Sequence, residues 1–164
     1  MIGPLPDPTA FLERVFTALA KDGIDVASLP LDHICYRVVS MHRYEELRTA
    51  FHDHATLLSD AMIGGRPIST FRSHVPFVHR DRRLDVFELP APKAGRPYPE
   101  GYEHVEFAVG EHPLSFAERY PGVAWDRSDA GKSVNPDVRL HFDGFSVKFH
   151  EHPLDHVIAH LDPR

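Results

Sequence analysis

One short pattern occurs twice in this 164-residue chain, and it limits the possible folds more than any other feature. The stretches LDHICYRV (31–38) and YEHVEFAV (102–109) each place an acid and a histidine before an apolar alternation. Such an alternation is typical of a half-buried β-strand. The two histidines are His33 and His104. We interpret the chain as a duplicated unit whose halves each send side chains to one shared site.

The order of the other segments supports this interpretation. Residues 8–21 predict an amphipathic helix, which could act as a lid or as a homodimer contact. Residues 30–90 read as strand, helix and three strands, with a hairpin turn at Gly64-Gly65. A proline-rich connector follows, and residues 101–152 repeat the order, with a short strand near Trp125 and a type I′ turn at Asp143-Gly144. A terminal helix is expected over 153–162. We treat 1–164 as a single domain.

Composition excludes several classes of protein. The hydrophobic fraction of 42% is that of a globular chain, and the net charge of -6, without a long Lys/Arg run, disfavours a nucleic-acid partner. The single cysteine, Cys35, fits a reducing cytoplasm and is expected to be a small buried residue. The N-terminus lacks the basic and apolar regions of a signal peptide, and no stretch is apolar enough for a membrane span. These features predict a soluble, cytoplasmic protein with no membrane partner.

A second correspondence links the ends of the two halves. The stretch VFELP in the first half matches KFHEHP in the second, which pairs Glu88 with His150. Because side chains alternate along a strand, the polar residues of these strands share one face and apolar residues the other. If the sheet curls, His33, Glu88, His104 and His150 gather in one cavity.

Three imidazoles and a carboxylate suit a divalent ion such as Zn, Ni, Co, Mn or Fe(II). Glu106 should lie on the same face as His104, as a fifth ligand, a partner that orients a ligand, or a general base. Asp32 and Glu103 should point to the opposite face. A strand histidine is, however, more often a surface or hydrogen-bonded core residue than a ligand, so the residues alone leave both interpretations open.

Longer blocks of sequence carry a resemblance to a known family. GRPI, FELP, YPEGYEHVE and VKFHEHP resemble the YecM family within the vicinal oxygen chelate superfamily, over about residues 8–160. The resemblance implies an α+β fold in which two βαβββ modules form a cupped mixed sheet around a central cavity, with flanking helices. It also implies metal ligands at His33, Glu88, His104 and His150. Many superfamily enzymes have glutamate where this chain has His150, which leaves the fourth ligand open.

The leading hypothesis is a metal-dependent enzyme that acts on a small oxygen-rich substrate by isomerase, lyase, group-transfer or oxidoreductase chemistry. Glu106, or a displaced Glu88, would be the base. Arg37, Arg72 and Lys148 would hold an anionic group, although Arg37 and Lys148 could instead pair with Glu106. One alternative is a non-catalytic small-molecule binding protein that uses the same cavity. Another is a purely structural ion, whose removal would unfold the chain.

Overall fold

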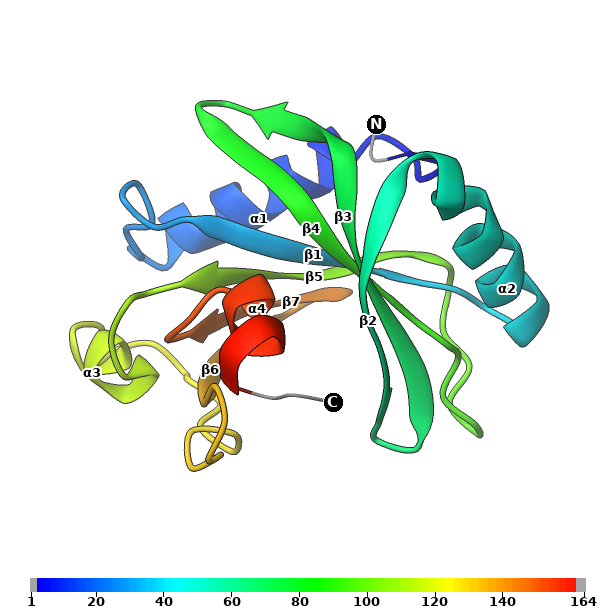
Figure 1. The fold of residues 1–164 in the computed structure, drawn as a ribbon. Helices are drawn as coiled ribbons and strands as arrows, with labels where there is room; N and C mark the ends of the chain where they lie inside the picture. The colour runs from blue at the N-terminus through cyan, green and yellow to red at the C-terminus, as the bar shows by residue number, and fades with distance from the viewer. Residues whose placement is uncertain (1–2, 162–164) are drawn as a thin grey trace.

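A computed structural model describes residues 3–161, and its centre is one seven-stranded mixed sheet flanked by helices (Figure 1). The first half of the chain holds helix α1 (Thr9–Lys21), strand β1 (Leu31–Arg37), helix α2 (Met41–Ala50), the short helix η1 (Phe51–Asp53), and strands β2 (Ala55–Ile63), β3 (Arg66–His79) and β4 (Arg82–Pro90). The second half holds strand β5 (Gly101–Ala108), helix α3 (Pro113–Glu118), strands β6 (Asp137–Phe142) and β7 (Phe145–His150), and the terminal turns α4 (Leu154–His156) and η2 (Val157–Leu161).

The two halves meet at the antiparallel pair of β1 and β5. Across the sheet the strand order is β2-β3-β4-β1-β5-β7-β6, so each half extends outward from this junction. Strand β1 pairs in parallel with β4, and β5 pairs in parallel with β7. This repetition relates β1 to β5 and β4 to β7. The predicted α+β class and the duplicated mixed sheet are confirmed.

The second half is one strand shorter than its predicted pattern. The region near Trp125 forms only an isolated antiparallel bridge between Asp126 and Arg139 instead of a strand. Since Arg139 lies on β6, this bridge is where a counterpart of β2 would pair. The second module is therefore β-α-β-β with a single bridge at its edge.

Two predicted hairpins are present, but they turn differently. Gly64 and Gly65 connect β2 to β3 with φ angles of 58° and 79°. Positive φ at both central residues is what a type I′ turn requires. The turn between β6 and β7 is at Asp143-Gly144 as predicted, but only Gly144 has a positive φ. The expected type I′ geometry is therefore wrong for this second hairpin.

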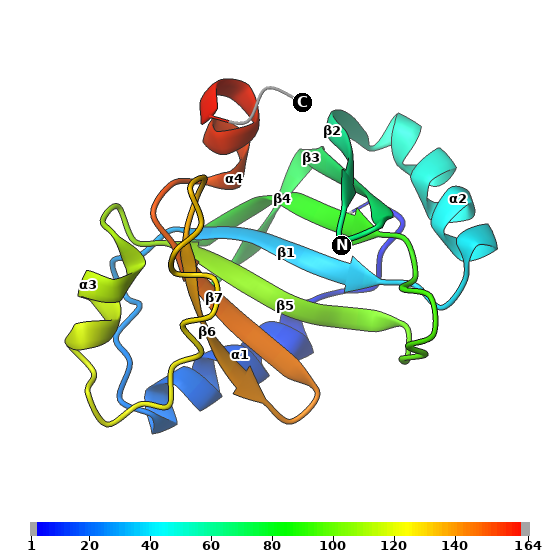
Figure 2. The same ribbon diagram turned by 90° about the horizontal axis from the view of Figure 1, so that it is seen from below.

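The apolar core lies on one face of the sheet, beneath α1. The α1 residues Phe11 and Phe16 contact Tyr102 and Phe107 of β5, with ring centroids 5.6 and 6.2 Å apart. Figure 2 shows α1 on the opposite side of the sheet from α4. Because Phe107 alternates with Glu106 along β5, this core is on the face away from the polar residues. Helix α1 is thus a structural layer and does not act as a lid.

Among the helices of residues 3–161, none combines the length and the apolar character that a membrane span needs.

Candidate metal and substrate site

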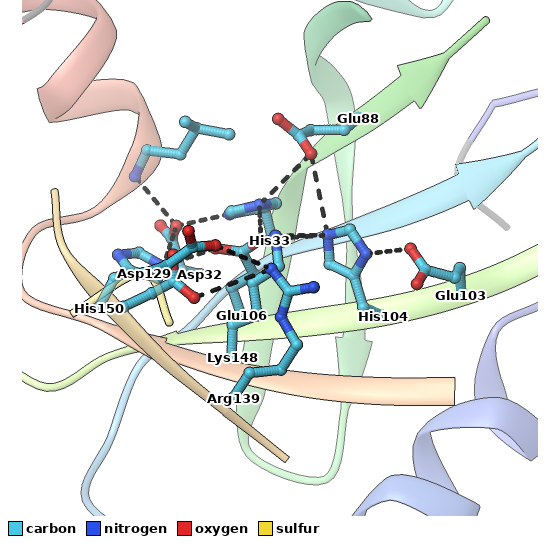
Figure 3. A network of polar contacts seen from close by, with 12 residues as sticks. Asp32, His33, Glu88, Glu103, His104, Glu106, Asp129, Arg139, Lys148 and His150 are labelled. Carbon is cyan, nitrogen blue, oxygen red and sulfur yellow. Dashed lines mark hydrogen bonds and ion pairs between the residues drawn. The ribbon is translucent and has the colours of Figure 1, made fainter. Parts of the chain in front are cut away.

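Strands β1, β4 and β5 bring four ligand-type side chains together. In the β1–β5 ladder His33 lies opposite Glu106 and Cys35 opposite His104, while β4 places Glu88 beside Cys35. One ligand atom from each of His33, Glu88, His104 and Glu106 lies within 4.8 Å of the others. These four residues are a candidate set of metal ligands, and we call them the metal centre (Figure 3).

Glu106 occupies the middle of the metal centre. Its Oε1 atom is 3.3 Å from Nε2 of His33 and 3.1 Å from Nε2 of His104. Both Nε2 atoms are 3.9 Å from Oε2 of Glu88. The structure therefore brings together three of the four predicted ligands, His33, Glu88 and His104, and makes Glu106 as central as they are.

The alternation predicted that Asp32 points to the opposite face of the sheet. The structure instead places its carboxylate beside His33. Its Oδ2 atom lies 2.7 Å from Nδ1 of the adjacent His33. The ladder pairs Leu31 with Phe107 and His33 with Glu106, so Asp32 is an extra residue in β1. Such a β-bulge changes the direction of a side chain without shifting the rest of the strand.

Glu103 differs from its expected orientation for the same reason. In β5 the ladder passes from His104 to Tyr102, which leaves Glu103 as the extra residue of a second bulge. Its carboxylate contacts Nδ1 of His104 and forms an ion pair with Arg37 at 2.6 Å. Each half of the duplicated unit therefore has an acid in a bulge next to its strand histidine.

The hydrogen bonds at Nδ1 leave Nε2 of His33 and His104 facing the cavity, and Nε2 of His150 facing Asp32 and Glu106. Asp32 and Glu103 accept from the Nδ1 atoms of His33 and His104, and His150 Nδ1 is 2.6 Å from the His152 carbonyl oxygen. These acceptors assign a proton to Nδ1, so Nε2 is the nitrogen that could offer a lone pair to a metal ion once the imidazole is neutral. Among residues 3–161, Nε2 of His33 and Nε2 of His150 have no hydrogen-bond partner.

His150 lies beside the metal centre, in a second group. Its Nε2 atom is 3.3 Å from Oδ2 of Asp32 and 3.5 Å from Oε2 of Glu106. Together with Asp32 and His33 it forms a separate set of possible ligands. Asn135, with a positive φ of 44°, holds the segment after His150 because its Oδ1 accepts from the backbone N–H of His152 at 3.1 Å.

The register also corrects the match between Glu88 and His150. On β4, Glu88 lies beside Cys35, two residues after His33; on β7, Lys148 lies beside Glu106, two residues after His104. Lys148 is therefore the counterpart of Glu88, and His150 is one pleat further along. The match between VFELP and KFHEHP was based on similar residues before a proline. Such a match carries no information on how the strands pair.

Lys148 is the positive charge in direct contact with the metal centre. Its Nζ atom is 2.5 Å from Oε1 of Glu106 and 3.5 Å from Nε2 of His104. Burial disfavours both charged forms, but the pair stabilises them, so the pKa of Lys148 is raised and that of Glu106 lies well below its usual range. A carboxylate with such a low pKa is a weak base.

The two histidines of the metal centre hold protons more strongly than free imidazole. Burial disfavours the imidazolium of His33, but Glu106 and Asp32 outweigh it and raise its pKa to about 10. Burial and Lys148 both disfavour the charged form of His104. Contacts with Cys35 and Glu103 outweigh them, so its pKa is well above the usual value. A metal ion must therefore compete with protons here.

The metal centre forms the floor of a cavity of about 720 Å³. Arg37 and Lys148, both predicted to bind an anion, line this cavity. Arg72, predicted with them, does not line it; this arginine forms an ion pair with Asp155 of α4. Arg37 pairs with Glu103 and not with Glu106.

Several cavity residues were not identified from the sequence. The proline-rich connector contributes Lys93, Arg96 and Tyr98, and the loop before β6 contributes Lys132 and Asn135. These segments have no periodicity that would predict which side chains face the cavity.

The residues of the metal centre fit a divalent transition ion. Two imidazole Nε2 atoms and two carboxylates are a common donor set for Zn, Mn or Fe(II). The partnerless buried Nε2 of His33 is what a histidine ligand shows when no ion is bound. The carboxylates of Asp32 and Glu103, which accept from Nδ1, are the kind of group that orients metal-binding histidines. Lys148 would have to move or share Glu106 with the ion.

Comparisons with known proteins support a family assignment. A family model described as "YecM protein" matches residues 5–130. "Protein YecM" of Escherichia coli (strain K12) is 28% identical over 177 residues, covering 96% of this chain and 94% of that protein. An uncharacterised Haemophilus influenzae protein is 32% identical over 102 residues, covering 61% of this chain and 53% of its own length.

Solved structures show the same fold. A protein called EC4020 superposes with a TM-score of 0.77 at 26% identity, covering 92% of this chain and 86% of the other. Streptomyces coelicolor methylmalonyl-CoA epimerase, solved with 2-nitronate-propionyl-CoA, gives a TM-score of 0.52 at 16% identity and covers 76% of this chain and 98% of the other. At that identity the likeness shows the fold alone, which this chain shares with methylmalonyl-CoA epimerase.

Proposed function

Because the chain belongs to the YecM family and has the fold of the vicinal oxygen chelate superfamily, we propose that it is a metal-dependent enzyme acting on a small oxygen-rich substrate. The observation that carries the proposal is the set of buried histidines with Nδ1 bound to an oxygen acceptor and Nε2 facing carboxylates.

We place the ion between His33, Glu88, His104 and Glu106, with His150 as a further candidate ligand beside them. When bound, the ion would polarise two neighbouring oxygens of a substrate and stabilise negative charge that develops on them. Nδ1 contacts from Asp32 and Glu103 fix the two imidazole rings, so the Nε2 atoms keep their direction.

The proton-transfer role fits Glu88 better than Glu106. Glu106 is buried and ion-paired with Lys148, which makes its carboxylate a weak base. Glu88 lines the cavity with 14% of its side chain exposed, and its ion-pair contacts are at 3.9 Å. We propose that Glu88, displaced from the ion, takes or returns the proton at carbon. Lys148 would share Glu106 with the ion, and Arg37 would stay paired with Glu103. Proton transfer in an isomerisation or lyase step would use this arrangement.

The first test is metal content by mass spectrometry on untagged protein, followed by uptake from zinc, nickel, manganese and ferrous salts. We expect about one ion per chain, lost in His33→Ala/His104→Ala. His42→Ala/His52→Ala is the matched control, because both of these histidines are exposed and lie outside the cavity. Circular dichroism must show that His33→Ala/His104→Ala is folded. Glu88→Gln is a second variant that changes a single ligand of the metal centre.

Substrate screening then separates catalysis from binding. Loaded protein is mixed with compounds that have adjacent oxygens, and exchange of their carbon-bound hydrogen with D₂O is followed by NMR. Exchange that depends on the ion and is lost in Glu88→Gln supports the enzyme. No bound ion and no uptake would overturn the metal proposal. An ion without exchange in any compound that binds would favour a binding protein.

A further inference from the structure

The cavity has more positive charge than its carboxylates neutralise. Seven of the lining side chains are cationic and four are acidic, although the whole chain has a net charge of -6. Four of the cations form ion pairs with carboxylates. The other three, Arg66, Lys93 and Arg96, have no ion-pair partner among the residues that the structure describes. We call these three residues the basic wall.

Tyr98 contacts two of the three residues of the basic wall. Its hydroxyl oxygen accepts from Nη1 of Arg66 at 3.1 Å and from the backbone N–H of Lys93 at 3.3 Å. Arg66 Nη1 also donates to the carbonyl of Ala91 at 2.9 Å. The guanidinium of Arg37 lies over the Tyr98 ring, 4.7 Å from its centroid. One side chain thus fixes two arginines and the backbone of a lysine.

The connector around Tyr98 holds its shape through its own turn. The backbone N–H of Arg96 donates to the carbonyl of Lys93 at 3.2 Å, and Gly95 takes a positive φ of 71°. Prolines at 92 and 97 restrict the chain on both sides of the turn. The side chains of Lys93 and Arg96 are exposed at the rim, where they can reach a ligand that enters the cavity.

The basic wall and the metal centre line the same cavity. Glu88 is five residues before Lys93, so their Cα atoms are no more than about 17 Å apart. Ile68 pairs with Pro90 between them, and both of these residues also line the cavity. A ligand that fills this part of the cavity would therefore contact both the metal centre and the basic wall.

We propose that the substrate is a small phosphate ester whose phosphate binds the basic wall, while its neighbouring oxygens face the metal centre. The placement of the neighbouring oxygens at the metal centre rests on the proposed function. The placement of the phosphate rests on the basic wall alone. Three unpaired cations match a phosphate group with two negative charges better than a single carboxylate. Guanidinium groups bind phosphate oxygens through paired N–H donors.

The test measures binding of inorganic phosphate and pyrophosphate by calorimetry, on full-length protein treated with a chelator so that no ion can bind the anion. We compare wild type with Lys93→Gln/Arg96→Gln. Both side chains are exposed and make no ion pair, so this variant should fold normally. Lys21→Gln/Arg83→Gln is the control, because it removes the same charges from exposed positions outside the cavity.

We expect about tenfold or greater loss of phosphate affinity in Lys93→Gln/Arg96→Gln and little change in the control. Absence of phosphate binding in wild type, or equal weakening in the two variants, would overturn the inference. Succinate is a second ligand in the same assay. Succinate binding as tight as phosphate binding would overturn the phosphate assignment.

Metal content of the same samples separates this inference from the proposed function. Lys93→Gln/Arg96→Gln should keep its ion, and His33→Ala/His104→Ala should lose its ion but keep phosphate binding. An ion without phosphate binding would overturn the basic wall alone. Phosphate binding at the wall without any ion would overturn the metal proposal alone.

Discussion

At the scale of single residues, Lys148 has two opposing effects. Its ammonium neutralises the buried Glu106 at 2.5 Å when no ion is bound, and it would repel a divalent ion held by the same carboxylate. Glu106 therefore has a charged partner without a metal ion, and this internal competitor would reduce the affinity of the site for an ion.

We predict that Lys148→Met binds zinc about tenfold more tightly, because a like charge is removed from beside the ion. The same variant should be less stable without metal, by about 3 kcal/mol, because Glu106 loses its buried partner. Competition with a chromophoric chelator measures the affinity, and urea denaturation measures the stability. Lys132→Met removes a cavity lysine that pairs with Asp129 and Asp137, and should leave zinc affinity nearly unchanged. Unchanged affinity in Lys148→Met would rule out the competition.

Glu103 makes the stability of the metal-free protein depend on pH. Burial raises the pKa of its carboxyl, but His104, Arg37 and Lys148 outweigh that effect and lower it from 4.5 to about 2. Because the folded state binds this proton less readily than the unfolded state, the stabilisation is present above pH 4.5. It is lost as the pH falls toward 2.

We therefore expect the free energy of unfolding to fall less steeply between pH 4.5 and about 2 in Glu103→Gln than in the wild type. The two slopes should differ by up to about 1.4 kcal/mol per pH unit. Urea denaturation at several pH values measures the slopes. The control is Glu118→Gln, since Glu118 is exposed and has no ion pair among residues 3–161. Parallel slopes for wild type and Glu103→Gln would show that the Glu103 contacts contribute no stability.

At the scale of elements, the two faces of the sheet have separate roles. Helix α1 packs on the apolar face through Leu12, Val15 and Leu19, which are fully buried. The cavity is on the other face. Damage to the α1 layer should therefore reduce stability without changing the ligand set.

Leu12→Ala should lower the free energy of unfolding by about 2 to 5 kcal/mol, because it opens a hole in the core. Under conditions where it is still folded, it should bind zinc like wild type. Leu57→Ala, at a position 45% exposed on β2, should change neither property much. Loss of zinc affinity in folded Leu12→Ala would mean that α1 is coupled to the metal centre.

The elements also show which parts of the fold the sequence determines. Apolar alternation located β1 and β5, and the glycine pair located the first hairpin, because both signals are local. Alternation failed at Asp32 and Glu103, because it assumes an unbroken ladder and a bulge appears only once strands pair. The pairing of His150 with Glu88 failed because register is set between strands. Arg66 joins the basic wall through contacts to Tyr98 and Ala91, which are 32 and 25 residues further along the chain, so no local pattern predicts them.

At the scale of the whole molecule, the metal centre lies across the junction of the two halves. His33 and Glu88 come from the first half, and His104 and Glu106 from the second. The sheet is continuous through this junction, with ladder pairs from Leu31 to Arg37. An ion should therefore strengthen a junction that already exists, and its removal should not separate the halves.

Removal of the ion with a chelator should lower the melting temperature but leave the far-UV circular dichroism spectrum at 25 °C unchanged. At a free ion concentration 100 times Kd, binding would contribute about 2.7 kcal/mol. Calorimetry with and without added zinc measures the shift, which should vanish in His33→Ala/His104→Ala. Unfolding of the wild type on chelation would instead identify the ion as a purely structural one.

The paired bulges bear on how such a site can arise. In each half, the acid that orients the imidazole directly precedes its histidine in the chain, at Asp32-His33 and Glu103-His104. A gene segment that encodes one half therefore encodes a ligand together with the group that orients it. Duplication and fusion of that segment would yield two oriented ligands in a single event. Divergence at the remaining positions, such as Glu88 and Lys148, could then adjust the chemistry while that inherited pair stayed intact.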